Sequence, residues 1–131
     1  MAKAKVKMPE MKQALTDRRA QLETELGQLS NELRELGIDQ GLEQGAAGNH
    51  LADDGSLVFE AERIGTVSDD LRDVLNQVNS ALERMDEGTY GTCQRCNRPI
   101  NRDRLEAFPY VAYCIECQTT LERENALLNG R

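Results

Sequence analysis

Four cysteines in the last third of the chain carry the clearest chemistry in the sequence. They form two pairs in the pattern C-x2-C-x17-C-x2-C: Cys93, Cys96, Cys114 and Cys117. Thiolates are donors that Zn2+ prefers, and this spacing lets four sulfurs surround one ion tetrahedrally at about 2.3 Å. Because four thiolates leave no coordination position for substrate or water, we expect one structural Zn2+.

Redox chemistry at a single Cys-x-x-Cys pair is the competing interpretation. Such pairs act in a thioredoxin-like strand–helix setting, and no such pattern surrounds these cysteines. The sequence has one histidine, His50, which is distant from the cysteines and is interpreted as a loop residue. Because there is also no Ser/His/Asp set and no phosphate-binding loop, we do not expect an enzyme.

An arginine-rich stretch begins inside the first cysteine pair. Its basic residues could contact an acidic protein surface or a nucleic acid: Arg95, Arg98, Arg102 and Arg104. Asp103 and Glu106 are interleaved with them, which favours a solvated surface of mixed charge. The chain has a net charge of −7, whereas phosphate binding needs clustered Lys and Arg. We therefore do not expect direct, sequence-specific DNA binding.

Apolar residues at heptad spacing predict two long helices before the cysteines. The first stripe predicts a helix over residues 9–36, with Pro9 in its first turn and Gly37 at its end. That stripe comprises Met8, Leu15, Leu22, Leu29 and Leu36. The second stripe predicts a helix over residues 56–87, which Gly88 ends. Residues 64–67 include Gly, Thr and Val, which have low helix propensity, so the helix is expected to be less stable there. That stripe comprises Leu57, Ala61, Ile64, Leu71, Leu75, Val78, Leu82 and Met85.

These elements predict a mainly α fold. A disordered basic tail covers residues 1–8, and a long antiparallel coiled-coil hairpin covers residues 9–87, with a glycine-rich tip loop at about 37–55. Residues 88–131 then form a small C4 zinc-finger globule with a short C-terminal helix. Coiled-coil pairing between two chains is the alternative. The matched stripe lengths and the long intervening loop favour pairing within one chain, and hence a monomer.

The acidic excess of the chain is concentrated around the predicted tip loop. Residues 37–70 contain eight acidic side chains and one basic side chain. Such a surface favours a basic or metal-bearing partner. The N-terminal sequence MAKAKVKM lacks the apolar segment of a secretory signal, and no run of about 18 apolar residues occurs. We therefore expect a cytoplasmic protein without a membrane segment.

The cysteine module resembles the DksA/TraR family of bacterial transcription regulators. Besides the four cysteines, Ile100, Arg104 and Pro109 stand at the family's spacings, preceded by the similar lead-in ALERMDEGTYGTC. The segment NHLAD…FEAER resembles the coiled-coil tip of shorter members. The resemblance implies a protein that binds RNA polymerase directly. Its hairpin enters the secondary channel, which leads to the catalytic Mg2+, and its finger rests on the rim.

The resemblance also implies roles for individual residues. Four would form the tip inside the channel: Asn49, His50, Asp53 and Asp54. The arginine-rich stretch would supply rim contacts. The best-known members carry Asp-x-x-Asp-x-Ala at the tip, whereas this chain has adjacent aspartates. The tip is therefore expected either to act differently or to bind without the same output. At the family's site for the alarmone ppGpp, the matching positions are Gln77, Phe108 and Gln118. Because none is basic, no strong ppGpp response through that site is expected.

A different function for the same architecture is a protein-interaction scaffold. In that alternative, a zinc-stapled coiled coil binds a protein other than RNA polymerase. Self-association, or capture of another partner, would distinguish it from a polymerase regulator.

Overall fold

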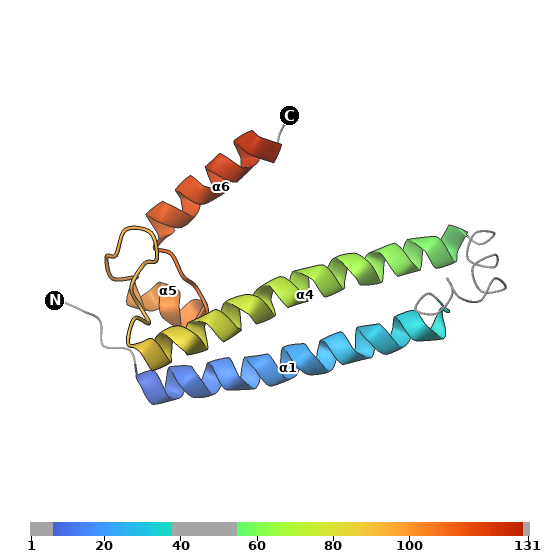
Figure 1. Cartoon of the computed structure of the whole chain (residues 1–131), viewed down its shortest axis with the longest axis horizontal. Coiled ribbons are helices and arrows are strands. Elements are labelled where there is room, and N and C mark those ends of the chain that lie inside the picture. The colour runs from blue at the N-terminus through green and yellow to red at the C-terminus, as the bar shows by residue number, and fades with distance from the viewer. Residues whose placement is uncertain (1–6, 38–54, 130–131) are drawn as a thin grey trace. The chain divides into compact units, whose positions relative to one another are not determined.

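The computed structural model describes residues 7–37 and 55–129, which form a mainly helical fold (Figure 1). Within these ranges the helices are α1 (Met8–Glu35), α4 (Gly55–Glu87), α5 (Arg102–Ala107) and α6 (Ile115–Asn129). The β-structure of the same ranges is limited to an isolated bridge between Thr92 and Pro99. The predicted mainly α class is therefore confirmed.

Glycines end both long helices as predicted. Gly37 has a φ of 84°, and its N–H donates to the Arg34 carbonyl at 2.9 Å. Gly88 has a φ of 83°, and the following N–H of Thr89 donates to the Arg84 carbonyl at 2.9 Å. Glycine adopts this left-handed conformation without the steric cost that a Cβ imposes. The bounds of α1 and α4 fall within one residue of the predicted ones, and α4 remains helical through Gly65.

The chain divides into two compact units, and the division crosses both long helices. Unit 1 comprises Met1–Arg18 and Asn76–Arg131, and unit 2 comprises Arg19–Leu75. The predicted division into a hairpin over residues 9–87 and a finger module over residues 88–131 stays a prediction. The structure groups the last turns of α4 with the finger because both contribute to one apolar core.

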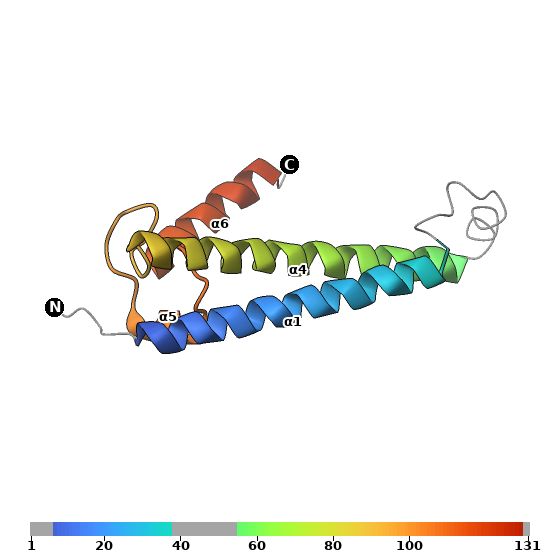
Figure 2. The same cartoon turned by 60° about the horizontal axis from the view of Figure 1, so that its bottom comes forward.

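Unit 2 contains an antiparallel pair of helical segments (Figure 2). Arg63 of α4 lies 3.9 Å from Glu32 of α1. Earlier α1 residues such as Glu25 line a hollow shared with the later α4 residue Leu71, which is the order that antiparallel helices require. The helices bury apolar side chains between them, among them Leu22 and Ile64, with at most 1% of either exposed. The predicted packing of two long helices is confirmed.

Unit 1 joins the two long helices to the finger through a small apolar core. Val78 and Ala81 of α4 are fully buried, as is Leu15 of α1 apart from 1% of its surface. Leu105 of α5 is buried in the same unit. The short helix α5 begins at Asn101, whose side chain accepts the Asp103 N–H at 2.7 Å. This cap fixes where the chain turns back towards the second cysteine pair.

Among the described residues, no helix is both long and apolar enough to cross a membrane. The four predicted tip residues, Asn49, His50, Asp53 and Asp54, lie outside the described residues.

Candidate functional site

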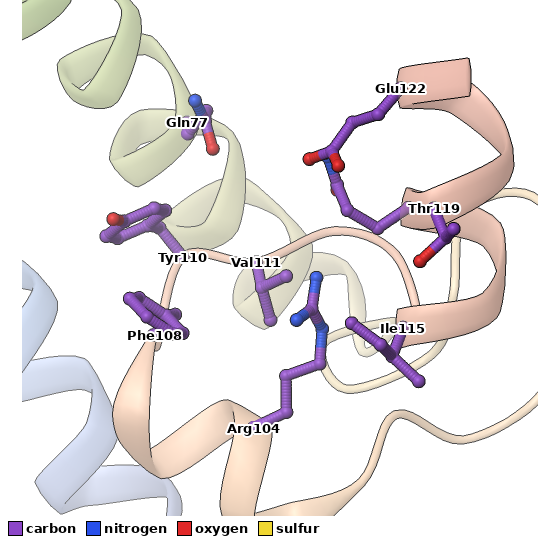
Figure 3. Close-up of a pocket in the computed structure, with 9 residues that line it drawn as sticks. Gln77, Arg104, Phe108, Tyr110, Val111, Ile115, Thr119 and Glu122 are labelled. Atoms are coloured by element: carbon purple, nitrogen blue, oxygen red, sulfur yellow. The ribbon is translucent and has the colours of Figure 1, made fainter. Parts of the chain in front are cut away.

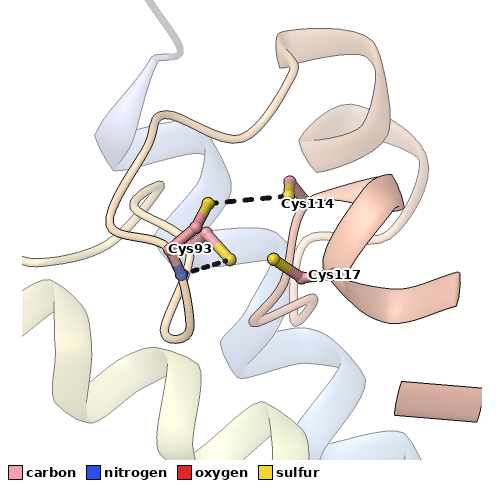
Figure 4. Close-up of side chains that lie close together, drawn as sticks. Cys93, Cys114 and Cys117 are labelled. Atoms are coloured by element: carbon pink, nitrogen blue, oxygen red, sulfur yellow. Dashed lines mark hydrogen bonds between the residues drawn. The ribbon is translucent and has the colours of Figure 1, made fainter. Parts of the chain in front are cut away.

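The four cysteines lie together in unit 1. Figure 4 shows the side chains of Cys93, Cys114 and Cys117 turned towards one space. All four Sγ atoms lie within 4.8 Å of one another. The Sγ atoms of Cys96 and Cys114 are 3.8 Å apart. Four sulfurs placed tetrahedrally at about 2.3 Å from a zinc ion would be separated by about 3.8 Å. The residues therefore fit one tetrahedral Zn2+.

The first cysteine pair lies in a tight turn built by backbone hydrogen bonds. The Cys93 N–H donates to the Arg98 carbonyl at 2.8 Å, and the Asn97 N–H donates to the Cys93 carbonyl at 3.0 Å. Asn97 has a φ of 64°, a conformation that asparagine tolerates better than most residues. The turn thereby directs both sulfurs of the pair to the same side.

The second cysteine pair is positioned by the start of α6. Cys114 immediately precedes the helix and Cys117 lies in its first turn. The Gln118 N–H donates to the Cys114 carbonyl at 2.9 Å, which continues the helical hydrogen bonding back to that residue. Because one helical turn separates the two residues, their side chains lie on the same face.

Hydrogen bonds around the sulfurs of Cys93 and Cys96 favour the thiolate form that a metal requires. Burial raises the pKa of Cys93, but backbone N–H groups outweigh burial and lower that pKa to about 6. The N–H groups of Arg95 and Cys96 each donate to the Cys93 Sγ at 3.4 Å. The guanidinium Nε of Arg98 donates to the Cys96 Sγ at 3.4 Å. Such outer contacts orient metal ligands and stabilise their charge.

Comparison with known proteins identifies this module. The sequence profile of the prokaryotic dksA/traR C4-type zinc finger matches residues 88–123. These residues form a DksA/TraR zinc finger. The match and the clustered cysteines together confirm the prediction of one structural zinc held by a DksA/TraR finger.

One relative extends the likeness beyond the DksA/TraR finger, and a second matches a shorter part of the chain. General stress protein 16O of Bacillus subtilis is 35% identical over 119 residues, which cover 88% of this chain and 64% of that protein. The RNA polymerase-binding transcription factor DksA of Caulobacter vibrioides is 36% identical over 52 residues, covering 40% of this chain and 37% of that protein. The chain thus spans less than two thirds of the length of these relatives.

A solved structure supports the fold around the DksA/TraR finger. The transcription factor DksA2 from Pseudomonas aeruginosa superposes with a TM-score of 0.69, covering 89% of this chain and 84% of that chain. The two sequences are 23% identical. At this identity the likeness concerns the fold, namely two long helices followed by the finger.

The structure gives each predicted rim arginine a partner within unit 1. Arg95 pairs with Glu124 at 3.2 Å and Arg98 with Glu116 at 3.4 Å, so both fasten α6 to the first cysteine turn. Arg102 pairs with Glu106 at 3.0 Å. The Nε of Arg104 donates to the Tyr113 carbonyl at 3.0 Å. Rim contact by these residues stays a prediction.

Two residues that the sequence analysis missed hold the loop after α5. Arg84 is 7% exposed, and its guanidinium donates to the Val111 carbonyl at 3.3 Å. The Tyr90 hydroxyl donates to the Pro109 carbonyl at 2.7 Å. Burial lowers the pKa of Arg84 from its usual value. The sequence does carry one signal for the burial of Arg84. It stands three residues after the apolar Ala81, so both side chains lie on the inward face of α4.

The three positions considered for ppGpp do lie together. They line a hollow of about 350 Å³ in unit 1: Gln77, Phe108 and Gln118 (Figure 3). The charged residues of this hollow are one cation, Arg104, and one anion, Glu122. A polyphosphate favours several cations. The absence of a strong ppGpp response stays a prediction.

Replacing Tyr90 by Phe should lower the free energy of unfolding by about 1 kcal/mol at neutral pH, because the hydrogen bond to Pro109 is lost. Burial also raises the pKa of Tyr90 to about 12, above the unfolded value of about 10. The stability linked to this raised pKa is present below about pH 10 and is lost as the pH rises towards about 12. The difference between wild type and Tyr90→Phe in urea unfolding should therefore shrink above about pH 10. A difference that is the same at neutral and alkaline pH would contradict this assignment.

Proposed function

We propose that this chain binds bacterial RNA polymerase directly and regulates transcription initiation without being an enzyme. The observation that carries the proposal is the DksA/TraR finger joined to a pair of long helices, an arrangement it shares with DksA2. Several relatives of the finger are named RNA polymerase-binding transcription factors. The four-cysteine site would stabilise the fold of the finger. With four thiolate ligands, the metal has no open coordination position at which a substrate could react.

The proposed mode of binding is insertion of the α1–α4 hairpin into the secondary channel. The charge of unit 2 supports this proposal. Its described residues, 19–37 and 55–75, carry nine acidic and four basic side chains. Acidic helices are attracted to a basic or metal-bearing channel, and their attraction strengthens where little water separates the charges. Asn49, His50, Asp53 and Asp54 would then act at the tip.

Crosslinking from the predicted tip tests this mode of binding. A photoreactive amino acid at position 54 of the zinc-loaded protein should crosslink to the polymerase subunits that surround the active site. The same probe at Asn125, an exposed residue of α6, serves as the control and should not reach that region. Absence of binding to core polymerase would contradict the proposed function. Binding without the crosslink at position 54 would contradict only channel insertion.

The acidic tip is expected to act after binding. The double variant Asp53→Asn, Asp54→Asn should bind polymerase with an affinity within about threefold of wild type, because one pair of charges contributes little beside a whole interface. Its effect on transcription initiation in vitro should fall by about tenfold if the tip charges act near the catalytic Mg2+. The matched control is Asp69→Asn, Asp70→Asn, an exposed adjacent pair in α4. Equal effects of both pairs would contradict a specific role of the tip.

A further inference from the structure

The segment between α5 and α6 brings the second cysteine pair to the metal site. The described residues 108–114 belong to no helix or strand, and they end at Cys114. We call them the Cys114 loop. Buried carbonyl groups outside regular structure need other hydrogen-bond donors. In this loop, side chains donate to three carbonyls, those of Pro109, Val111 and Tyr113.

The three donors come from different parts of unit 1. Arg84 lies in the last turn of α4, Tyr90 lies between α4 and the first cysteine pair, and Arg104 lies in α5. Figure 3 shows the Arg104 side chain extending from α5 beside Val111. Because the donors lie on three separate elements, a shift of the Cys114 loop would break at least one of these hydrogen bonds.

A backbone hydrogen bond joins the Cys114 loop to the first cysteine pair. The Gln94 N–H, in the turn between Cys93 and Cys96, donates to the Ala112 carbonyl at 2.8 Å. Two residues after Ala112, the Sγ of Cys114 lies 3.8 Å from that of Cys96. The conformation of the loop therefore sets the distance between the two cysteine pairs.

The burial of two donors indicates that their hydrogen bonds, rather than the space they fill, account for these side chains. Arg84 and Tyr90 are each 7% exposed. Transfer of a guanidinium group from water into a protein interior is unfavourable, whereas an apolar side chain of similar length would fill the same space without that penalty. The hydrogen bonds to the loop carbonyls offset part of the penalty.

We propose that Arg84, Tyr90 and Arg104 are positioning residues of the zinc site, which hold the Cys114 loop so that the second cysteine pair meets the first around the metal. Ligands that are ordered before the metal arrives lose less conformational entropy on binding, so the metal binds more tightly. Replacing residues that orient metal ligands typically lowers metal affinity by about 10–100-fold. This role concerns the metal and does not require RNA polymerase.

The zinc affinity of the full-length protein tests these positioning residues. Arg84→Met keeps a long side chain but removes the donor, and competition with a chromophoric chelator should show a zinc affinity lowered by about tenfold or more. Arg84→Lys keeps a cationic donor and should lose less affinity. The matched control is Arg102→Met, because Arg102 pairs with the exposed Glu106 instead, and its affinity should stay within about threefold of wild type.

Alkylation of the cysteines separates positioning from a general loss of stability. At saturating zinc, iodoacetamide should modify Cys114 and Cys117 of Arg84→Met about tenfold faster than in wild type, in proportion to the weaker hold on the metal. Cys93 and Cys96 should react at rates close to those of wild type, because their turn keeps its own hydrogen bonds. Mass spectrometry of tryptic peptides resolves the two pairs.

Other outcomes overturn the proposal. Unchanged zinc affinity in Arg84→Met, or an equal loss in Arg102→Met, would show that the Cys114 loop is not held for the metal. Equal acceleration of alkylation at all four cysteines would show a general loss of stability instead. If Arg84→Met loses its helical circular dichroism at saturating zinc, Tyr90→Phe, which removes a single oxygen atom, decides the question. Selective alkylation of its second cysteine pair supports the proposal, and wild-type alkylation overturns it.

Discussion

Replacing Cys93 by Ser should abolish zinc binding and unfold the finger. Cys93 has no exposed surface, and its sulfur accepts two backbone N–H groups that favour a thiolate. A serine hydroxyl does not ionise near neutral pH and is a poor zinc ligand. Metal binding to a small finger is largely its folding free energy, about 10–16 kcal/mol in zinc-finger peptides. The loss of one ligand should therefore be the largest effect of any single substitution in unit 1.

Zinc content and circular dichroism measure this result. Metal analysis of wild-type protein should give about one zinc per chain, and Cys93→Ser should fall close to zero. Helical signal from α6 should decrease, because its start supplies Cys114 and Cys117. Signal from the unit 2 helices should persist, since their buried contacts do not involve the metal. Gln94→Ser, an exposed change in the same turn, is the control. Full zinc retention by Cys93→Ser would refute the assigned site.

Replacing Leu22 by Ala should destabilise unit 2 by about 2–5 kcal/mol, the usual cost of a cavity in a packed core. Leu22 has no exposed surface and lies between α1 and α4. Leu29 occupies the next heptad position but is only half-buried, so Leu29→Ala should cost clearly less. The comparison separates burial from helix propensity, because both substitutions replace the same residue type in the same helix.

Urea unfolding followed by circular dichroism at a helical wavelength checks this difference. The transition midpoint of Leu22→Ala should fall well below that of Leu29→Ala, with similar slopes if the unfolded states are alike. Equal losses for both variants would mean that the heptad stripe is buried uniformly. That result would favour coiled-coil pairing with a second chain over the hairpin.

The long helices could be predicted because local signals agree with their packing. Pro9, Gly37 and Gly88 mark helix ends through backbone restrictions that act in any context. The leucine stripe then identifies the inward face. The zinc site could be predicted for a similar reason, since the spacing of the four cysteines limits where the sulfurs lie. Both kinds of signal depend on a characteristic spacing along the sequence.

The surroundings of the finger could not be predicted in the same way. Helix α5 has six residues, too few for a periodic pattern. The ion pair between Arg95 and Glu124 joins residues 29 apart, and the bond from Arg84 to the Val111 carbonyl joins residues 27 apart. Such contacts depend on how the finger folds back onto α4. The exposed Phe108 ring likewise gives no signal in the sequence, because a phenylalanine is usually assigned to a core.

Helix α6 buries none of its residues, although it begins at two zinc ligands. Beyond its first turn, the contacts of α6 with the finger include the exposed ion pair between Glu124 and Arg95, and exposed ion pairs weaken as salt increases. We therefore expect its outer turns to unfold locally, without unfolding of the core. Amino-acid changes and insertions there should be nearly neutral for folding. A natural chain could thus vary this segment freely, and a fluorescent label placed there would report binding without perturbing the core.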